Sequence, residues 1–175
     1  MESFDVSILI GSDSDYPIIE ETITILEKFN VKYKLTVTSA HRTPERTEKW
    51  IRFSENNGAK IFIVAAGAAA HLAGVVASKT TLPVIAIPVA STSLNGVDAL
   101  FSTVQMPGGV PVATMSIGRA GAKNAGIFAI QILSLINPEL KLKLNNFKVE
   151  MKRNVEDKAK RLKIKNSNVI SNFED

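Results

Sequence analysis

The stretch Val6-Ser-Ile-Leu-Ile-Gly11 is a short, almost wholly apolar run that ends at a glycine. Runs of this kind are typical of strands that are buried on both faces of a parallel sheet. The next apolar residues, from Ile18 to Leu26, recur at helical spacing. Asp15 precedes them as a candidate cap, and Pro17 stands where a first helical turn tolerates proline. The stretch therefore predicts a strand, a turn and a helix.

The same alternation continues along the chain. Thr43 is placed to cap a second helix, and Gly58 is placed to end it. Strands that alternate with helices predict a three-layer α/β/α sandwich with a mostly parallel central sheet. We expect the further strands at residues 33–38, 61–65, 84–87 and 112–115, and the further helices at residues 44–57, 72–79, 94–103 and 120–135.

Composition excludes several classes of protein. The 175 residues contain no cysteine and two histidines, which excludes disulfides, a thiolate nucleophile and cysteine-based metal sites, and leaves too few histidines for most zinc sites. We therefore predict no metal. No apolar run approaches the roughly 20 residues that span a bilayer. The first residues are acidic, unlike a secretory signal, so we expect a cytoplasmic protein without a membrane partner.

The net charge of +4 belongs to the end of the chain. Residues 1–137 contain 11 Lys and Arg and 11 Asp and Glu, whereas residues 138–175 contain 10 and 6. In this tail the basic side chains alternate with apolar ones and have few aromatic neighbours. The pattern favours a solvated amphipathic helix, and the alternative is an arm that binds acidic partners. We predict no nucleic-acid partner.

Residues 61–137 are unusually poor in charge. Their only charged side chains are Lys79, Asp98, Arg119 and Lys123. Several helices in this stretch are therefore too apolar for the exposed surface of a monomer. We expect their extra apolar faces to be buried between subunits.

Ligands of such sheets bind at the carboxyl ends of the strands, and the turn after the first strand suits a phosphorylated sugar. In Gly11-Ser-Asp-Ser-Asp15, the backbone N–H groups and the hydroxyls of Ser12 and Ser14 can bind an anion. Asp15 repels phosphate but accepts hydrogen bonds from ribose hydroxyls. The turn is neither a P-loop nor a dinucleotide fingerprint, and an ordinary helix start is the alternative interpretation.

The turns after the second and third strands each contain a histidine. In Ser39-Ala-His-Arg-Thr-Pro44, His41 can exchange a proton and Arg42 can hold a phosphate. Ala66-Gly-Ala-Ala-Ala-His-Leu-Ala-Gly74 is a small-residue loop that leaves backbone N–H groups open to a flat ligand or a carboxylate, with His71 beside the opening. Close packing of a helix on a strand is the alternative interpretation of this loop.

Taken in order, these segments resemble the N5-carboxyaminoimidazole ribonucleotide mutase family, the class I form of the phosphoribosylaminoimidazole carboxylase catalytic subunit. The resemblance covers most of residues 6–135. It is carried by Gly11-Ser-Asp-Ser-Asp15, Ser39-Ala-His-Arg-Thr-Pro44, Gly67 to Gly74, Leu94-Asn-Gly-Val-Asp98, Val104-Gln-Met-Pro-Gly-Gly-Val-Pro111-Val-Ala-Thr114 and Ala120-Gly-Ala-Lys-Asn-Ala-Gly126.

The resemblance implies a flavodoxin-like fold, a homo-octamer and no cofactor. It implies interconversion of N5-carboxyaminoimidazole ribonucleotide and 4-carboxy-5-aminoimidazole ribonucleotide in purine biosynthesis, through carbon dioxide. His41 takes the family's general acid/base position. The expected substrate-binding residues are Ser12, Asp15, Arg42, Ser39, Ser14, Gly67, His71 and Leu72.

The chain departs from the family pattern in the third turn. The family usually has Gly-Gly-Ala-Ala where this chain has Gly67-Ala-Ala-Ala70, and His-Leu-Pro-Gly where it has His71-Leu-Ala-Gly74. The loop's shape and mobility are therefore expected to differ, while the histidine is retained. We divide the chain into an α/β catalytic domain at residues 1–137 and a helical extension of the same domain at residues 138–175.

Two other functions compete with the mutase interpretation. The first is direct carboxylation of aminoimidazole ribonucleotide by free carbon dioxide, the class II reaction, which shares the fold and the histidine. The second is a non-catalytic nucleotide-binding module, which would have no need of His41. The quoted segments resemble class I more closely than class II.

Overall fold

The computed structural model describes residues 3–172. The chain divides into two compact units, the first ending at Leu133 and the second beginning at Ser134. Each unit is described by itself. The proposed division at residues 137 and 138, and the inclusion of the extension in the same domain, stay predictions.

The first unit is built on a five-stranded sheet in the order β2-β1-β3-β4-β5. Every neighbouring pair of strands is parallel, so the predicted sandwich is confirmed with a wholly parallel sheet. This order is that of flavodoxin-like folds. The strands are β1 (Val6–Ile10), β2 (Tyr33–Val37), β3 (Ile61–Gly67), β4 (Val84–Val89) and β5 (Ala113–Thr114).

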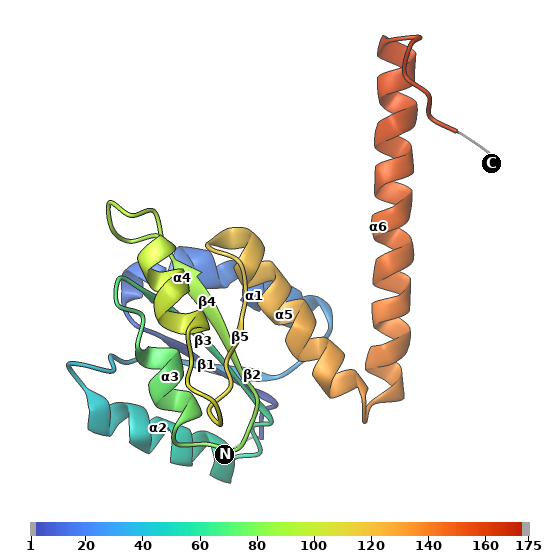
Figure 1. Cartoon of the computed structure of the whole chain (residues 1–175). Coiled ribbons are helices and arrows are strands. Elements are labelled where there is room, and N and C mark those ends of the chain that lie inside the picture. The colour runs from blue at the N-terminus through green and yellow to red at the C-terminus, as the bar shows by residue number, and fades with distance from the viewer. Residues whose placement is uncertain (1–2, 173–175) are drawn as a thin grey trace. The chain divides into compact units, whose positions relative to one another are not determined.

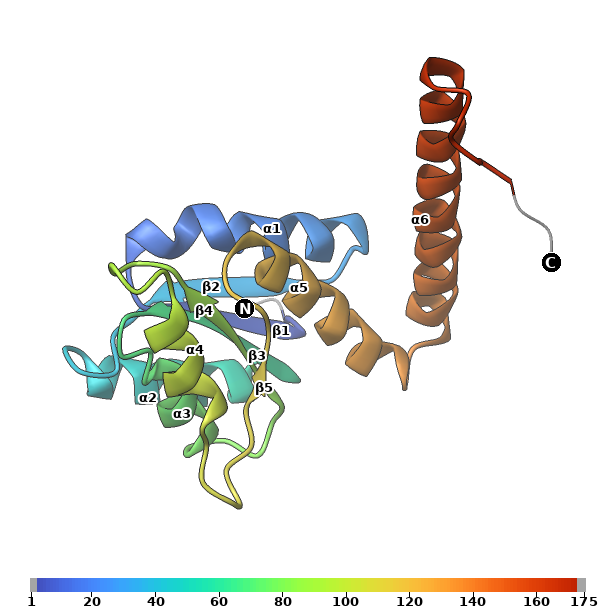
Figure 2. The same cartoon turned by 45° about the horizontal axis from the view of Figure 1, so that its top comes forward.

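Helices cover both faces of this sheet (Figures 1 and 2). On one face α1 lies beside α5, and the Thr22 hydroxyl of α1 donates a 2.7 Å hydrogen bond to the Ala122 carbonyl of α5. On the other face α2, α3 and α4 share one apolar cluster with the sheet, through Ile51, Val76 and Ala99 among others. The helices are α1 (Tyr16–Lys28), α2 (Pro44–Asn56), α3 (Leu72–Ala77), α4 (Val97–Val104) and α5 (Arg119–Ser134).

The strand order explains which strands are apolar throughout. All residues of β1 and β4, and those of β3 up to Ala66, are buried, because these strands have a neighbour on each side and helices on both faces. β2 lies at an edge of the sheet, and its burial is mixed. The short β5 forms the other edge.

Two predicted helix caps are wrong. Asp15 and Thr43 occupy the capping positions of α1 and α2, but neither side chain caps its helix. The Asp15 carboxylate accepts a hydrogen bond from the Ser12 N–H, and the Thr43 hydroxyl accepts one from the Ser39 N–H. Both side chains therefore stabilise the preceding turn. The predicted stop is confirmed, since Gly58 follows α2 in a left-handed conformation, with φ of 91°.

The second unit contains the helix α6 (Pro138–Lys165), which confirms a C-terminal helix. The Asn137 side chain accepts hydrogen bonds from the N–H groups of Glu139 and Leu140 and so caps its start. Most of its side chains are exposed, and its buried ones are Leu140, Leu144 and Phe147. Within residues 3–172, no helix combines the length and apolarity that crossing a membrane requires.

Candidate functional site

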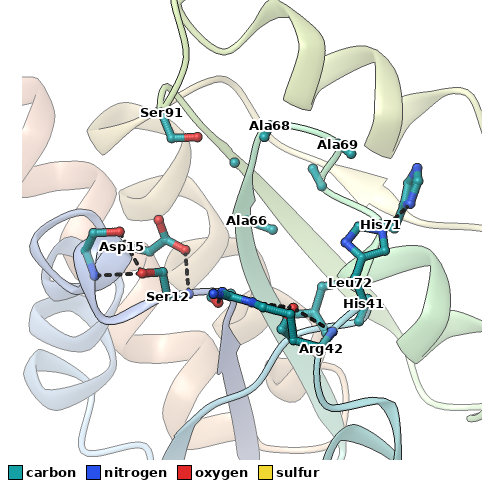
Figure 3. Close-up of a pocket in the computed structure, with 16 residues that line it drawn as sticks. Ser12, Asp15, His41, Arg42, Ala66, Ala68, Ala69, His71, Leu72 and Ser91 are labelled. Atoms are coloured by element: carbon teal, nitrogen blue, oxygen red, sulfur yellow. Dashed lines mark hydrogen bonds between the residues drawn. The ribbon is translucent and has the colours of Figure 1, made fainter.

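The candidate site lies where the connections that leave neighbouring strands cross to opposite faces of the sheet. β1 and β3 are neighbours, but the chain leaves β1 toward the face covered by α1 and leaves β3 toward the face covered by α3. A pocket of about 360 Å³ opens at these carboxyl ends (Figure 3). All residues predicted for the site line it, namely Ser12, Ser14, Asp15, Ser39, His41, Arg42, Gly67, His71 and Leu72.

The turn after β1 is a single 3-10 turn, Asp13–Asp15, which Ser12 caps. The Ser14 N–H and Ser14 hydroxyl both approach the Ser12 hydroxyl oxygen, at 3.3 Å and 2.9 Å. In return the Asp15 carboxylate accepts the Ser12 N–H at 3.1 Å. This reciprocal pairing is a capping box. It holds two hydroxyls and one carboxylate at the rim of the pocket.

Asp15 is a buried carboxylate, with 3% of its surface exposed. Burial raises the pKa of Asp15, and the backbone N–H groups of Ser12 and Gly11 oppose that shift. A buried carboxyl group that faces a pocket is stabilised when a ligand supplies hydrogen-bond donors. Sugar hydroxyls are donors of this kind, whereas phosphate oxygens are not.

The turn after β2 directs Arg42 across the pocket toward β1. The Arg42 backbone N–H and side-chain Nε both approach the Ser39 hydroxyl oxygen, at 3.3 Å and 3.4 Å. Its Nη2 lies 3.5 Å from the Gly11 carbonyl oxygen. The guanidinium group therefore lies beside the start of the first turn. The predicted anion-binding groups from two turns are brought together.

The loop after β3 has an uncommon backbone conformation, and burial of its end holds it in place. Ala68 and Ala70 have positive φ, at 52° and 37°, which L-residues rarely adopt. Ala70 and Leu72 are buried, and the Ala70 N–H donates to the Gly67 carbonyl at 3.0 Å. Ala68 and Ala69 are exposed and line the pocket. The loop thus presents small side chains and backbone to a ligand.

His41 and His71 meet at the pocket. Nε2 of His41 lies 2.7 Å from Nδ1 of His71, and the ring planes are inclined by 71°. In any such contact between neutral rings, one nitrogen donates and the other accepts. Sequence analysis placed both residues at the site but missed their contact. The contact is possible because only one strand, β1, lies between β2 and β3 in the sheet.

Sequence analysis also missed Ser91, which follows β4 and lines the pocket. Gly67 stands against it. A Cβ atom at Gly67 would lie 2.0 Å from the Ser91 hydroxyl oxygen and 2.7 Å from its Cβ, so only glycine fits there. The signal was present in the sequence, since Ser91 comes just after the predicted fourth strand.

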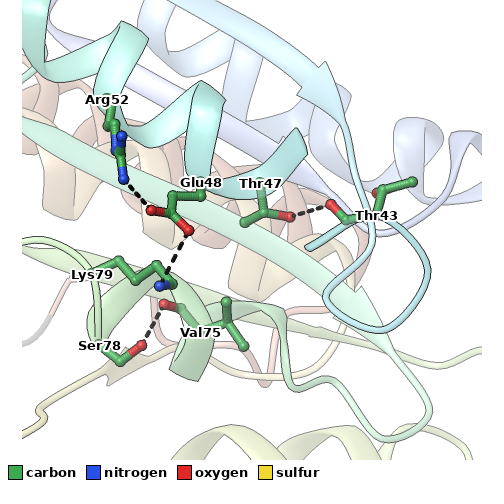
Figure 4. A network of polar contacts seen from close by, with 7 residues as sticks. All are labelled: Thr43, Thr47, Glu48, Arg52, Val75, Ser78 and Lys79. Atoms are coloured by element: carbon green, nitrogen blue, oxygen red, sulfur yellow. Dashed lines mark hydrogen bonds and ion pairs between the residues drawn. The ribbon is translucent and has the colours of Figure 1, made fainter. Parts of the chain in front are cut away.

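Polar contacts link the two helices that begin after the histidine turns (Figure 4). Glu48 of α2 pairs with Arg52 of the same helix and, at 3.4 Å, with Lys79 just beyond α3. Both cations hold the pKa of Glu48 below its usual value. Nearer the pocket, the Thr47 hydroxyl approaches the Thr43 carbonyl at 3.3 Å. α2 and α3 are thus connected at their surface, away from the histidines.

The arrangement has two chemically distinct parts. One part suits a ligand that carries both an anion and hydroxyl donors. It consists of Ser12, Ser14, Asp15, Ser39 and Arg42. The histidine pair next to the small-residue loop suits proton transfer on a flat ligand. In the described part of the chain, no three His, Cys, Asp or Glu side chains gather as a metal ion would need.

Comparison with known proteins agrees with this geometry. The AIR carboxylase family model matches residues 5–154. The chain is 52% identical over 157 residues to the N5-carboxyaminoimidazole ribonucleotide mutase of Pyrococcus horikoshii, covering 90% of this chain and 88% of the relative. It is also 52% identical over 157 residues to the mutase of Thermotoga maritima, covering 90% and 91%.

Solved structures show the same fold. The crystal structure of Treponema denticola PurE is similar with a TM-score of 0.81 and 28% sequence identity, covering 90% of this chain and 98% of that one. The family match includes every turn that lines the pocket. By its sequence and its fold alike, this chain belongs to the AIR carboxylase family.

Proposed function

We propose that the protein interconverts N5-carboxyaminoimidazole ribonucleotide and 4-carboxy-5-aminoimidazole ribonucleotide in purine biosynthesis. The observation that carries the proposal is the contact of His41 with His71 in a pocket whose other side is built for a phosphorylated sugar. Relatives that share about half of this sequence are named as mutases for this substrate. No cofactor enters the proposed reaction.

The phosphoribosyl part of the substrate would occupy the turns after β1 and β2. Arg42 would pair with the phosphate, helped by the hydroxyls of Ser12, Ser14 and Ser39, which line the same pocket. Asp15 would accept hydrogen bonds from the ribose. Separate groups would thus recognise the phosphate and the sugar.

His41 would act as the proton shuttle. In the first half, His41 donates a proton to the carbamate nitrogen, the C–N bond breaks and carbon dioxide leaves. In the second half, C4 of the resulting enamine attacks carbon dioxide and forms a C–C bond. The C4 proton then returns to His41, which restores the aromatic ring and the starting protonation state of the enzyme.

The small-residue loop would keep carbon dioxide beside C4. Carbon dioxide is uncharged, so it is held by shape and by the exclusion of water rather than by ion pairing. Gly67 has no side chain, Ala68 to Ala70 have small ones, and Leu72 is a buried apolar residue of the same lining. His71 would position His41 through their shared hydrogen bond and help shape this end of the pocket.

The experiment that tests the function supplies purified protein with each of two substrates, in the presence and absence of bicarbonate. A mutase forms the carboxylated imidazole from the N5-carboxylated nucleotide without bicarbonate. A direct carboxylase requires aminoimidazole ribonucleotide and carbon dioxide instead. If neither substrate reacts although the ribonucleotide binds, a nucleotide-binding module becomes the better interpretation.

We also propose that the protein assembles as a homo-octamer. Exposed apolar side chains gather on α4 and the segment before it, where Leu94, Val97, Phe101 and Val104 recur at helical spacing. Burial of this face in a neighbouring subunit would remove it from water. The number eight comes from the family resemblance. Light scattering at micromolar concentration tests the proposal, and a stable monomer would contradict it.

We place the reaction in the cytoplasm. The proposed substrate carries a phosphate and does not cross membranes unaided, so it must be consumed where it is made. Fractionation of the source cells, followed by the activity assay on each fraction, tests this location.

A further inference from the structure

One hydroxyl of the pocket has no hydrogen-bond partner in the described part of the chain. The Ser12 hydroxyl lies 3.1 Å from an Asp13 carboxylate oxygen, and the Ser14 hydroxyl lies 2.9 Å from that of Ser12. The Ser39 hydroxyl accepts from Arg42. Ser91 lines the same pocket. Neither a side chain nor the backbone of residues 3–172 pairs with its hydroxyl. Its donor and acceptor are therefore open to a ligand.

The segment that carries Ser91 is held in place by its neighbours. The Thr92 hydroxyl donates a 2.8 Å hydrogen bond to Oδ2 of Asp98 and accepts the Leu94 N–H at 3.1 Å. Asp98 lies in the first turn of α4, where the helix dipole favours a carboxylate. Its other oxygen, Oδ1, is buried with no partner among the described residues, so Thr92 is the partner on which this carboxylate depends. The contact fixes the loop after β4 to the start of α4.

Ser91 stands at the opposite side of the pocket from Arg42 (Figure 3). Arg42 follows β2 and Ser91 follows β4, and β1 and β3 lie between these strands in the sheet. Ala68 and Ala69 separate Ser91 from His71, so the small-residue loop has the histidines at one end and this hydroxyl at the other. A ligand whose phosphate pairs with Arg42 and whose ring lies over this loop would extend toward Ser91.

We propose that the Ser91 hydroxyl hydrogen-bonds the imidazole end of the ribonucleotide, at its amino or carboxylate substituent, and that Thr92 and Asp98 position Ser91. This inference rests on the proposed function, because it takes an aminoimidazole ribonucleotide as the ligand. It adds a recognition group for the ring. The turns after β1 and β2 recognise the phosphate and the sugar.

The test compares two ligands on two serine variants. Dissociation constants are measured by calorimetry for 4-carboxy-5-aminoimidazole ribonucleotide, which has the ring with both substituents, and for ribose 5-phosphate, which lacks the ring. Ser91→Ala is expected to weaken ribonucleotide binding about three- to tenfold, the effect of one lost hydrogen bond, and to leave ribose 5-phosphate binding unchanged. Ser93→Ala, on the same loop but outside the pocket lining, is the matched control and should change neither constant.

Equal weakening of both ligands by Ser91→Ala would overturn the assignment to the ring, and no weakening of either would overturn the contact itself. The proposed function fails differently. In that case the wild-type protein does not form the carboxylated imidazole, or Arg42→Ala binds ribose 5-phosphate as tightly as the wild type does.

The positioning role is tested at Thr92. Thr92→Val removes the hydroxyl that joins Asp98, and it should weaken ribonucleotide binding about as much as Ser91→Ala does, again without an effect on ribose 5-phosphate. Thr92→Ser keeps the hydroxyl and should restore the wild-type constant. Thermal melting identifies any variant that fails to fold. Failure of Thr92→Ser to rescue a folded Thr92→Val protein would overturn the positioning role.

Discussion

The two histidines are held by turns of opposite character. The turn after β2, which carries His41, is fixed by hydroxyl groups. The Thr38 hydroxyl lies 2.8 Å from that of Thr47 and 3.2 Å from that of Thr43, and the Thr43 hydroxyl accepts the Ser39 N–H at 2.9 Å. A hydrogen bond weakens steeply when its donor and acceptor are misaligned, so these three contacts restrict rotation of the turn.

The loop after β3, which carries His71, has no such network among the described side chains. Its Ala68 and Ala70 adopt left-handed conformations, which are unfavourable for any residue that has a Cβ atom. Burial of Ala70 and Leu72 and the packing of α3 hold the loop in this shape. The proposed proton shuttle therefore lies on a turn that hydrogen bonds fix, whereas its partner lies on a loop that packing holds in a strained backbone conformation.

The largest expected effect separates the two histidines. His41→Asn keeps much of the shape but removes proton transfer, so ribonucleotide binding should survive while turnover falls by about 10³- to 10⁴-fold, the upper end for general acid/base catalysis. His71→Asn should cost less, because that ring acts through His41. Turnover and substrate dissociation constants are measured on both variants in parallel. Retention of more than about a tenth of turnover in His41→Asn would show that the assigned mechanism is wrong.

The next effect concerns binding at the turn after β2. Arg42→Ala is expected to weaken ribonucleotide binding by about 2–4 kcal/mol, because a charge-assisted phosphate contact is lost. Arg46→Ala is the matched control. Its guanidinium group donates to Val37 and Thr36 of β2 and is not part of the pocket lining. Titration calorimetry measures both, and an unchanged dissociation constant for Arg42→Ala would contradict the phosphate assignment.

A third prediction tests the hydroxyl network itself. Thr43→Val removes the acceptor of the Ser39 N–H and should lower the free energy of unfolding by about 1–3 kcal/mol. Thr24→Val is the control, because the Thr24 hydroxyl makes an exposed bond to the Glu20 carbonyl within α1. Urea denaturation of the two variants gives the difference. Equal losses of unfolding free energy would mean that the Thr43 hydroxyl stabilises the protein no more than an exposed hydroxyl on a helix does.

The smallest expected effect tests the backbone strain in the loop after β3. Ala68→Gly should raise the free energy of unfolding, by up to about 1 kcal/mol, because relief of the left-handed strain exceeds the added chain entropy. Ala69→Gly has no positive φ to relieve and should lower it by about 0.5–1 kcal/mol. Urea denaturation measures both. The same sign for the two variants would mean that backbone strain does not shape this loop.

Much of the fold could be predicted from residue patterns. Apolar runs gave the five strands within a few residues, because a strand buried on both faces must be apolar along its length. The ends of the first three strands pointed to Ser12, His41 and His71, since the carboxyl ends of parallel strands lie at one edge of a sheet. The caps were less predictable. Asp15 and Thr43 stand at helix starts, but their oxygens found donors in the preceding turn.

By itself, the sequence determined the parallel α/β class, the turns that bear the chemistry and the family resemblance, because these depend on local period and on residue type. Only the tertiary structure decided that Nε2 of His41 meets Nδ1 of His71, that Ser91 joins the pocket against Gly67, and that Ala68 is left-handed. These features depend on strand order and on the face to which each crossover turns. Spacing along a chain does not encode contact between side chains 30 positions apart, because the packing of intervening elements sets it.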